Sequence, residues 1–134
     1  MDSYTRYAEL TKPTWSPPSW VFGPVWTVLY AIIAVSFGTV IYRAVAGTVS
    51  WMIALPFILN LIFNFAFTPI QFGLRNNVLA SVDILLVVGT LIWALVAVWY
   101  GVPELRWVVY VNIPYLLWGT FATCLQLTIT YLNK

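Results

Sequence analysis

Four long apolar segments constrain the fold of this chain more than any other feature. They run from Trp20 to Tyr42, from Trp51 to Gly73, from Val78 to Tyr100 and from Val108 to Asn133. A helix rises about 1.5 Å per residue and the hydrocarbon core of a bilayer is about 30 Å thick, so each segment is long enough to cross it. A barrel strand would instead alternate apolar and polar residues over about 10 positions. The segments predict an all-α integral membrane bundle of four transmembrane helices.

The composition supports this class and argues against several others. Hydrophobic residues make up 62% of the 134 residues and charged residues only 7%, whereas soluble domains carry about 25% charged residues. The net charge is +2 without any Lys/Arg cluster, so we expect no nucleic-acid partner. Because the chain has no His and one Cys, we expect no His/Cys metal site and no Ser-His or Cys-His catalytic pair.

The connections and basic residues suggest a simple organisation. Residues 1–19 form an N-terminal segment with a Pro- and Trp-rich loop, and residues 20–134 form the four-helix transmembrane domain. Basic residues on one side are Arg6, Lys12, Arg75 and Lys134, and those on the other side are Arg43 and Arg106. This bias favours cytoplasmic positions for both termini, because cytoplasmic loops are enriched in Lys and Arg.

Amides and aromatic rings recur at helical spacing inside the apolar segments. The three faces consist of Phe22, Trp26 and Tyr30; of Asn60, Asn64, Phe67 and Gln71; and of Asn112, Tyr115, Trp118, Ala122 and Gln126. An amide in hydrocarbon needs partners, so these faces should point into the bundle. The amides serve either as interhelical contacts or as ligand contacts. Aromatic faces interrupted by a few polar groups suit a pocket for a flat, hydrophobic, weakly polar ligand.

Asp83 is the one carboxylate inside a spanning segment. An intramembrane acid is by default a candidate for a functional site. Its position near the segment end and near Arg75 also allows a paired or snorkelling role, and both readings stay open. No nucleophile with a base and no two facing acids are visible, so we expect no catalytic residues of the ordinary kind.

Three runs of sequence resemble one known family. The runs KPTWSPPSWVFGPVWTVLY, LNLIFNFAFTPIQF and IPYLLWGTFATCLQLTITYLN are similar to the tryptophan-rich sensory proteins (TspO), whose mitochondrial members are called translocator proteins or peripheral benzodiazepine receptors. The match extends in order from residue 7 to residue 133. It implies a helical membrane protein, commonly a homodimer, that requires no cofactor. Family ligands are porphyrins such as protoporphyrin IX, isoquinoline carboxamide drugs and, in animals, sterols.

The resemblance also assigns positions to a ligand pocket. Tyr7 and Pro17 match a lid loop; Trp26, Tyr30, Asn64, Phe67, Trp118 and Ala122 match the pocket walls; and Asp83 matches a family acid. In the family, the equivalents of Trp26 and Asn64 hydrogen-bond ligand carbonyls, and those of Trp26 and Trp118 are implicated in porphyrin photochemistry. Phe22, Asn60 and Tyr115 join the predicted ligand-binding set from their spacing.

Two functions from different classes follow. The first is a receptor or sensor in a bacterial or archaeal cell membrane that binds tetrapyrroles, with at most a light-dependent, photo-oxidative porphyrin degradation. The second arises because the family has five helices, whereas only 14 residues precede Trp15 here and they are polar. The first helix is then lost, removed by truncation of the sequence, or supplied by another chain. An accessory transmembrane subunit would dock a partner helix in place of the family's first helix.

Overall fold

The computed structural model describes residues 21–70, 74 and 76–133 of this chain. The helices are α2 (Phe22–Val45), α3 (Trp51–Thr68), α4 (Asn77–Gly101), the short 3-10 helix η3 (Pro103–Leu105), α5 (Arg106–Val111) and α6 (Ile113–Leu132). Within those ranges no residue is in a strand. The predicted all-α membrane bundle is therefore confirmed.

Side-chain caps begin the two helices that form the centre of the bundle. Ser50 Oγ accepts a hydrogen bond of 3.1 Å from the Met52 N–H at the start of α3. Asn76 Oδ1 accepts one of 2.9 Å from the Leu79 N–H at the start of α4. Such caps satisfy backbone donors that have no partner within the helix. Gly47, with φ of 83°, turns the chain between α2 and α3, where a side chain would be strained.

The apolar helices differ in whether they are long enough to cross a bilayer. Gly23–Val45 and Asn77–Gly101 are each long and apolar enough to cross a membrane, and Trp51–Phe67 is a shorter apolar helix. Pro103–Val111 and Ile113–Leu132 pass that test only as a pair, with a bend of 47° between them. The expectation of one continuous helix from Val108 to Asn133 is therefore wrong. Pro114 accounts for the break, because it has no N–H to continue the helical hydrogen bonds.

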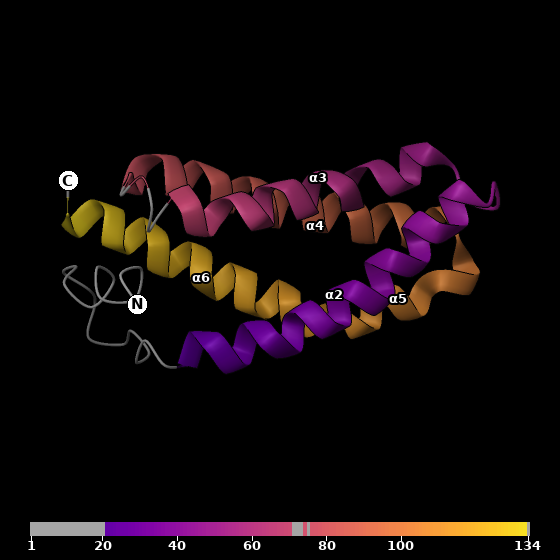
Figure 1. Ribbon diagram of the computed structural model, residues 1–134, viewed down its shortest axis with the longest axis horizontal. Helices are drawn as coiled ribbons and strands as arrows, with labels where there is room; N and C mark the ends of the chain where they lie inside the picture. The colour runs from indigo at the N-terminus through magenta and orange to yellow at the C-terminus, as the bar shows by residue number, and fades with distance from the viewer. Residues whose placement is uncertain (1–20, 71–73, 75, 134) are drawn as a thin grey trace.

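α3 and α4 run antiparallel and lie side by side along most of their length (Figure 1). They approach closely at one end, where a Cβ added at Gly101 would lie 2.7 Å from Ile53 Cδ1. α2 crosses the bundle obliquely, and its N-terminal half separates from α6 (Figure 1). The bundle is thus tightly paired on one side and diverges on the other.

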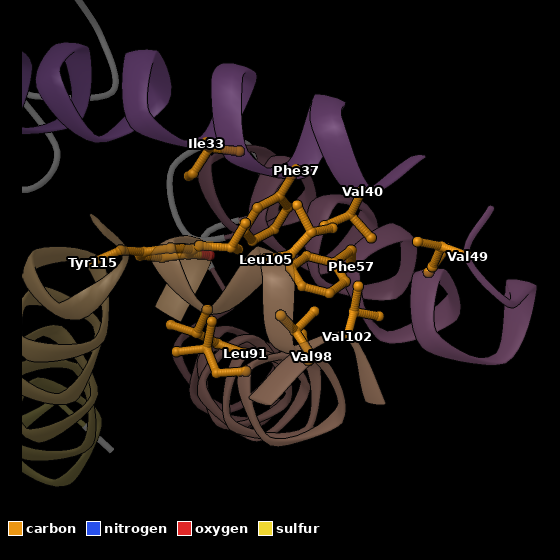
Figure 2. Packing of buried hydrophobic residues seen from close by; sticks show 14 of the residues in the cluster. Ile33, Phe37, Val40, Val49, Phe57, Leu91, Val98, Val102, Leu105 and Tyr115 are labelled. Atoms are coloured by element: carbon orange, nitrogen blue, oxygen red, sulfur yellow. The ribbon is translucent and has the colours of Figure 1, made fainter. Parts of the chain in front are cut away.

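The apolar core lies where α2, α3, α4 and α5 meet. The rings of Phe37 and Phe57 meet edge to face with centroids 4.8 Å apart, and Leu91 and Leu105 pack into the same cluster. Figure 2 shows Tyr115 at the border of this cluster. Many large apolar side chains instead face outward, among them Val28, Val35, Ile62, Leu85, Trp93 and Leu117. A surface of this kind is stable in lipid and would associate in water.

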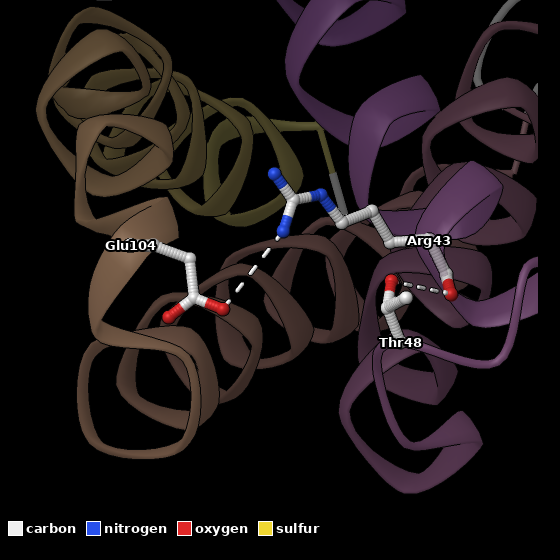
Figure 3. A network of polar contacts seen from close by, with 3 residues as sticks. All are labelled: Arg43, Thr48 and Glu104. Atoms are coloured by element: carbon white, nitrogen blue, oxygen red, sulfur yellow. Dashed lines mark hydrogen bonds and ion pairs between the residues drawn. The ribbon is translucent and has the colours of Figure 1, made fainter.

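Polar contacts join two connections at the end of the bundle farthest from the N-terminus of α2 (Figure 1). Arg43 Nη1 lies 3.8 Å from Glu104 Oε1, with side chains 38% and 60% exposed (Figure 3). The Thr48 hydroxyl donates a 3.2 Å hydrogen bond to the Arg43 carbonyl. An exposed ion pair of this type contributes about 1 kcal/mol or less. The contacts orient the connections more than they stabilise the bundle.

Candidate ligand-binding site

Asn60 is held at the centre of the bundle by partners on two other helices. It is fully buried. Its Nδ2 donates to the Val87 carbonyl at 2.7 Å and to Thr90 Oγ1 at 3.2 Å, both on α4. Its Oδ1 accepts a 2.8 Å hydrogen bond from the Tyr115 hydroxyl on α6. Asn60 therefore links α3 to α4 and α6 through hydrogen bonds. This is the interhelical contact that the sequence indicated as one of two roles for the amides.

Asn64 extends this connection to α2. Its Nδ2 donates to the Tyr115 oxygen at 2.7 Å, and its Oδ1 accepts a longer, 3.3 Å hydrogen bond from the Tyr30 hydroxyl. Asn64 is 5% exposed, whereas Tyr30 is 38% exposed. The two amides and two tyrosines form one continuous chain of hydrogen bonds, and its weakest link faces α2.

Aromatic rings surround the outer part of this chain. Trp26 lies 5.4 Å from Tyr30 and 6.4 Å from Tyr115, between ring centroids, and the second contact is edge to face. The Phe65 ring lies 5.9 Å from the Tyr30 ring. Aromatic contacts at these distances each contribute about 1 kcal/mol. The site therefore combines ring faces from α2, α3 and α6 with a small number of oriented polar groups.

Asp83 is a buried acid beside this cluster. It is 5% exposed, and its Oδ2 is buried with no hydrogen-bond donor in the described ranges. Asp83 lies one helical turn before Val87, whose carbonyl accepts the hydrogen bond from Asn60 Nδ2. Arg75, considered from the sequence as its partner, lies outside the described residues. Burial of Asp83 argues against the snorkelling alternative, since a snorkelling side chain would expose its charged end.

The other predicted site residues divide into two groups. Phe67, Trp118 and Ala122 are half-buried and pack against the apolar core, and the Trp118 ring also contacts Phe121 at 5.3 Å. Tyr7, Pro17 and the Phe22 side chain lie outside the described part of the chain, so their assignment to the lid and the first wall stays a prediction.

Asn112 does not join the site, although its spacing placed it on one face with Tyr115. It lies at the bend between α5 and α6, and its Nδ2 donates to Ser36 Oγ at 2.9 Å and to the Val108 carbonyl at 2.8 Å. The break at Pro114 changes the helix direction, so the 3.6-residue period does not continue across it. Asn112 instead connects the bend to α2.

Sequence reasoning missed Thr90 and Phe65, which contact Asn60 and Tyr30. The Thr90 hydroxyl also donates to the Leu86 carbonyl of its own helix at 2.7 Å. Most hydroxyls in apolar helices bond in this way, so the sequence contained no signal for a second role. Phe65 is one of many apolar residues in α3, and only the orientation of α2 brings Tyr30 to it.

The fold and the cluster define an integral membrane protein of the helical class with an aromatic and amide-lined interior. The TspO/MBR family model matches residues 1–132, and the chain belongs to this family. It is 38% identical to the tryptophan-rich protein TspO of Bacillus cereus over 131 residues, covering 96% of this chain and 81% of the relative. It is 40% identical to the human translocator protein over 123 residues, covering 90% and 70%. An archaeal relative, the tryptophan-rich protein TspO of Archaeoglobus fulgidus, is 33% identical over 132 residues, covering 96% and 80%.

Proposed function

We propose that this protein is a membrane receptor or sensor that binds flat hydrophobic ligands, tetrapyrroles such as protoporphyrin IX among them. The observation that supports this most is the hydrogen-bonded chain of Tyr30, Asn64, Tyr115 and Asn60 with the Trp26 ring against it. Ligand sites typically combine apolar and aromatic walls with a few oriented polar groups. Membership in the TspO/MBR family agrees with a receptor or sensor in a membrane.

Ligand binding at this site would begin at its weakest bond. The Tyr30 hydroxyl to Asn64 Oδ1 distance is 3.3 Å, close to the limit for an O–H donor. Tyr30 belongs to the N-terminal half of α2 (Phe22–Val45), and this half separates from α6 (Figure 1). A flat ligand that displaces this contact gains the ring faces of Trp26 and Tyr30, and it gains access to the Asn64 amide. The bonds that hold Asn60 to α4 would remain in place.

A titration with protoporphyrin IX tests this proposal. The protein is reconstituted in lipid nanodiscs, and the visible fluorescence of the porphyrin is followed with empty nanodiscs subtracted. Trp26→Ala should raise the Kd at least tenfold, a loss of about 1.4 kcal/mol. The matched control is Trp93→Ala, because Trp93 is 44% exposed on α4 and should face lipid. An equal Kd in wild type and Trp26→Ala, or equal losses in both variants, would contradict the assigned site.

Several finer expectations stay predictions. They are the homodimer, the accessory-subunit alternative, the cytoplasmic position of both termini and the light-dependent degradation of porphyrin. The last can be checked on the same nanodisc complex by following porphyrin absorbance under illumination. Bleaching faster than in empty nanodiscs, and slower again in Trp26→Ala, is the expected result.

A further inference from the structure

At each hydrogen bond between Val87 and Asn64, the donor and the acceptor can be assigned, and the assignment starts from the Val87 carbonyl. The Val87 carbonyl can only accept, so Asn60 must present its Nδ2 to it. Asn60 Oδ1 therefore faces Tyr115 and takes the single hydroxyl proton. The Tyr115 oxygen is left as an acceptor, and Asn64 must donate to it from Nδ2. As a result, Asn64 turns an acceptor, Oδ1, toward α2.

A second acceptor, Asp83, lies on the same level of the bundle. α3 and α4 are antiparallel (Figure 1), and Asn60 bonds to the Val87 carbonyl. One helical turn onward in α3 is Asn64, and one turn back in α4 is Asp83, so the two side chains are at similar depth. Asp83 Oδ2 is buried and has no donor within the described ranges.

The two acceptors differ from the other amide atoms of Asn60 and Asn64, which already have short hydrogen bonds. Asn60 Nδ2, Asn60 Oδ1 and Asn64 Nδ2 make hydrogen bonds of 2.7, 2.8 and 2.7 Å. A buried carboxyl without a donor costs free energy that a donor recovers. Among the amide and carboxyl atoms of the cluster, those without a short hydrogen bond to a described residue are therefore acceptors, Asn64 Oδ1 and Asp83 Oδ2 among them.

We propose that Asp83 and Asn64 Oδ1 form the polar recognition end of the site and select ligands that carry N–H donors on a flat aromatic body. This inference rests on the proposed function and names its ligand class. A cationic amine or ring nitrogen is the preferred donor, because hydrogen bonds between ionised partners are about twice as strong as neutral ones. At Asn64, a ligand whose polar groups are only carbonyls must instead compete with the Tyr115 oxygen for Nδ2.

Two probes with the same ring system test this selection. Acridine and 9-aminoacridine share three fused rings, and the second adds an exocyclic amine and is cationic at neutral pH. Each is titrated by fluorescence into wild-type protein in nanodiscs of zwitterionic lipid, with empty nanodiscs subtracted. Wild type should bind 9-aminoacridine at least tenfold more tightly than acridine. Asp83→Asn should reduce this preference to about threefold or less, mainly by weakening the binding of 9-aminoacridine. A cooperative unfolding transition in mixed detergent micelles shows that the variant is folded.

Ser81→Ala is the matched control for a polar deletion on the same helix. Ser81 is 6% exposed, but its hydroxyl bonds to Thr130 Oγ1 on α6 at 2.6 Å. This variant should keep the wild-type preference. An undiminished preference in Asp83→Asn, or no preference in wild type, would overturn the inference. In either case, binding of acridine and protoporphyrin would still support the proposed function. Failure of wild type to bind either acridine or protoporphyrin would overturn both.

Discussion

Two polar clusters contact α4, and they differ in what surrounds them. The inner cluster consists of Asn60, Asn64 and Tyr115, and the end cluster consists of Asn77, Ser81, Gln126 and Thr130. Both lie between helices, and both contain amides and hydroxyls. Aromatic rings of α2 border the inner cluster, and so does Asp83, whose Oδ2 has no hydrogen-bond donor among the described residues.

The side chains of the end cluster converge on a single backbone group. The Asn77 carbonyl accepts hydrogen bonds of 3.0 Å from Ser81 and 3.0 Å from Thr130, and Gln126 Nε2 donates to Thr130 at 3.1 Å. Asn77 Oδ1 is buried without a donor in the described ranges, but it belongs to a neutral amide in the first turn of α4. An amide inside a membrane helix therefore does not by itself mark a ligand site. The inner cluster is distinguished by an adjacent aromatic wall and by a carboxyl oxygen, Asp83 Oδ2, that has no donor within the described part of the chain.

The largest effect on stability should come from removing the centre of the inner cluster. Asn60→Leu leaves the Tyr115 hydroxyl, the Val87 carbonyl and Thr90 without their shared partner. Unfolding in mixed detergent micelles should show a loss of about 2 kcal/mol, near the upper end for hydrogen bonds in membranes. A loss below that of Thr130→Val would contradict the central position of Asn60.

Tyr115→Phe should separate stability from binding. The variant loses both bonds of the hydroxyl, to Asn60 and Asn64, and we expect unfolding to be easier by about 1.5 kcal/mol. It also frees Asn64 Nδ2 as a donor. The affinity for an isoquinoline carboxamide, which offers a carbonyl, should therefore rise about threefold, corresponding to about 0.6 kcal/mol. Weaker carboxamide binding in this variant would contradict the competition for Asn64.

Thr130→Val examines the end cluster alone. It removes the hydroxyl that joins Ser81, Gln126 and the Asn77 carbonyl. The expected loss is about 1 kcal/mol in the same unfolding assay. Protoporphyrin affinity should stay within about twofold of wild type. A larger change in affinity would show that the end cluster belongs to the ligand site.

The smallest effect concerns the apolar end of the α3–α4 pair. Gly101→Ala would place a Cβ 2.7 Å from Ile53 Cδ1, the mobile tip of a side chain, so a loss of about 0.5 kcal/mol is expected. Gly89→Ala is the control, since a Cβ there has no atom within 4 Å among the described residues and alanine favours helix. Ile53→Val combined with Gly101→Ala should recover the loss. Equal effects of the two glycine substitutions would argue against the close approach.

Much of the architecture could be predicted because apolar length and helical spacing are local properties of the sequence. The segment from Val78 to Tyr100 corresponds to α4 (Asn77–Gly101). Asn60 and Asn64 face the interior as their spacing requires. Pro114 was visible in the sequence, but membrane helices often tolerate proline, so the bend before α6 could not be decided from it.

The candidate site was only partly predictable because its chemistry depends on contacts between helices. Spacing selects Asn64 and Tyr115 as interior residues, yet it does not determine that one donates to the other. The direction of the chain depends on the Val87 carbonyl, a backbone group that composition and periodicity do not reveal. The same holds for Asp83, because the burial of its Oδ2 without a donor among the described residues depends on how the helices pack.

The difference between the two polar clusters is tested most directly by one protoporphyrin IX titration on three proteins in nanodiscs. These are wild type, Asn64→Leu in the inner cluster and Thr130→Val in the end cluster. We predict that Asn64→Leu raises the Kd at least tenfold and that Thr130→Val leaves it within about twofold. Equal Kd values for the two variants would contradict the assignment of the inner cluster as the ligand site.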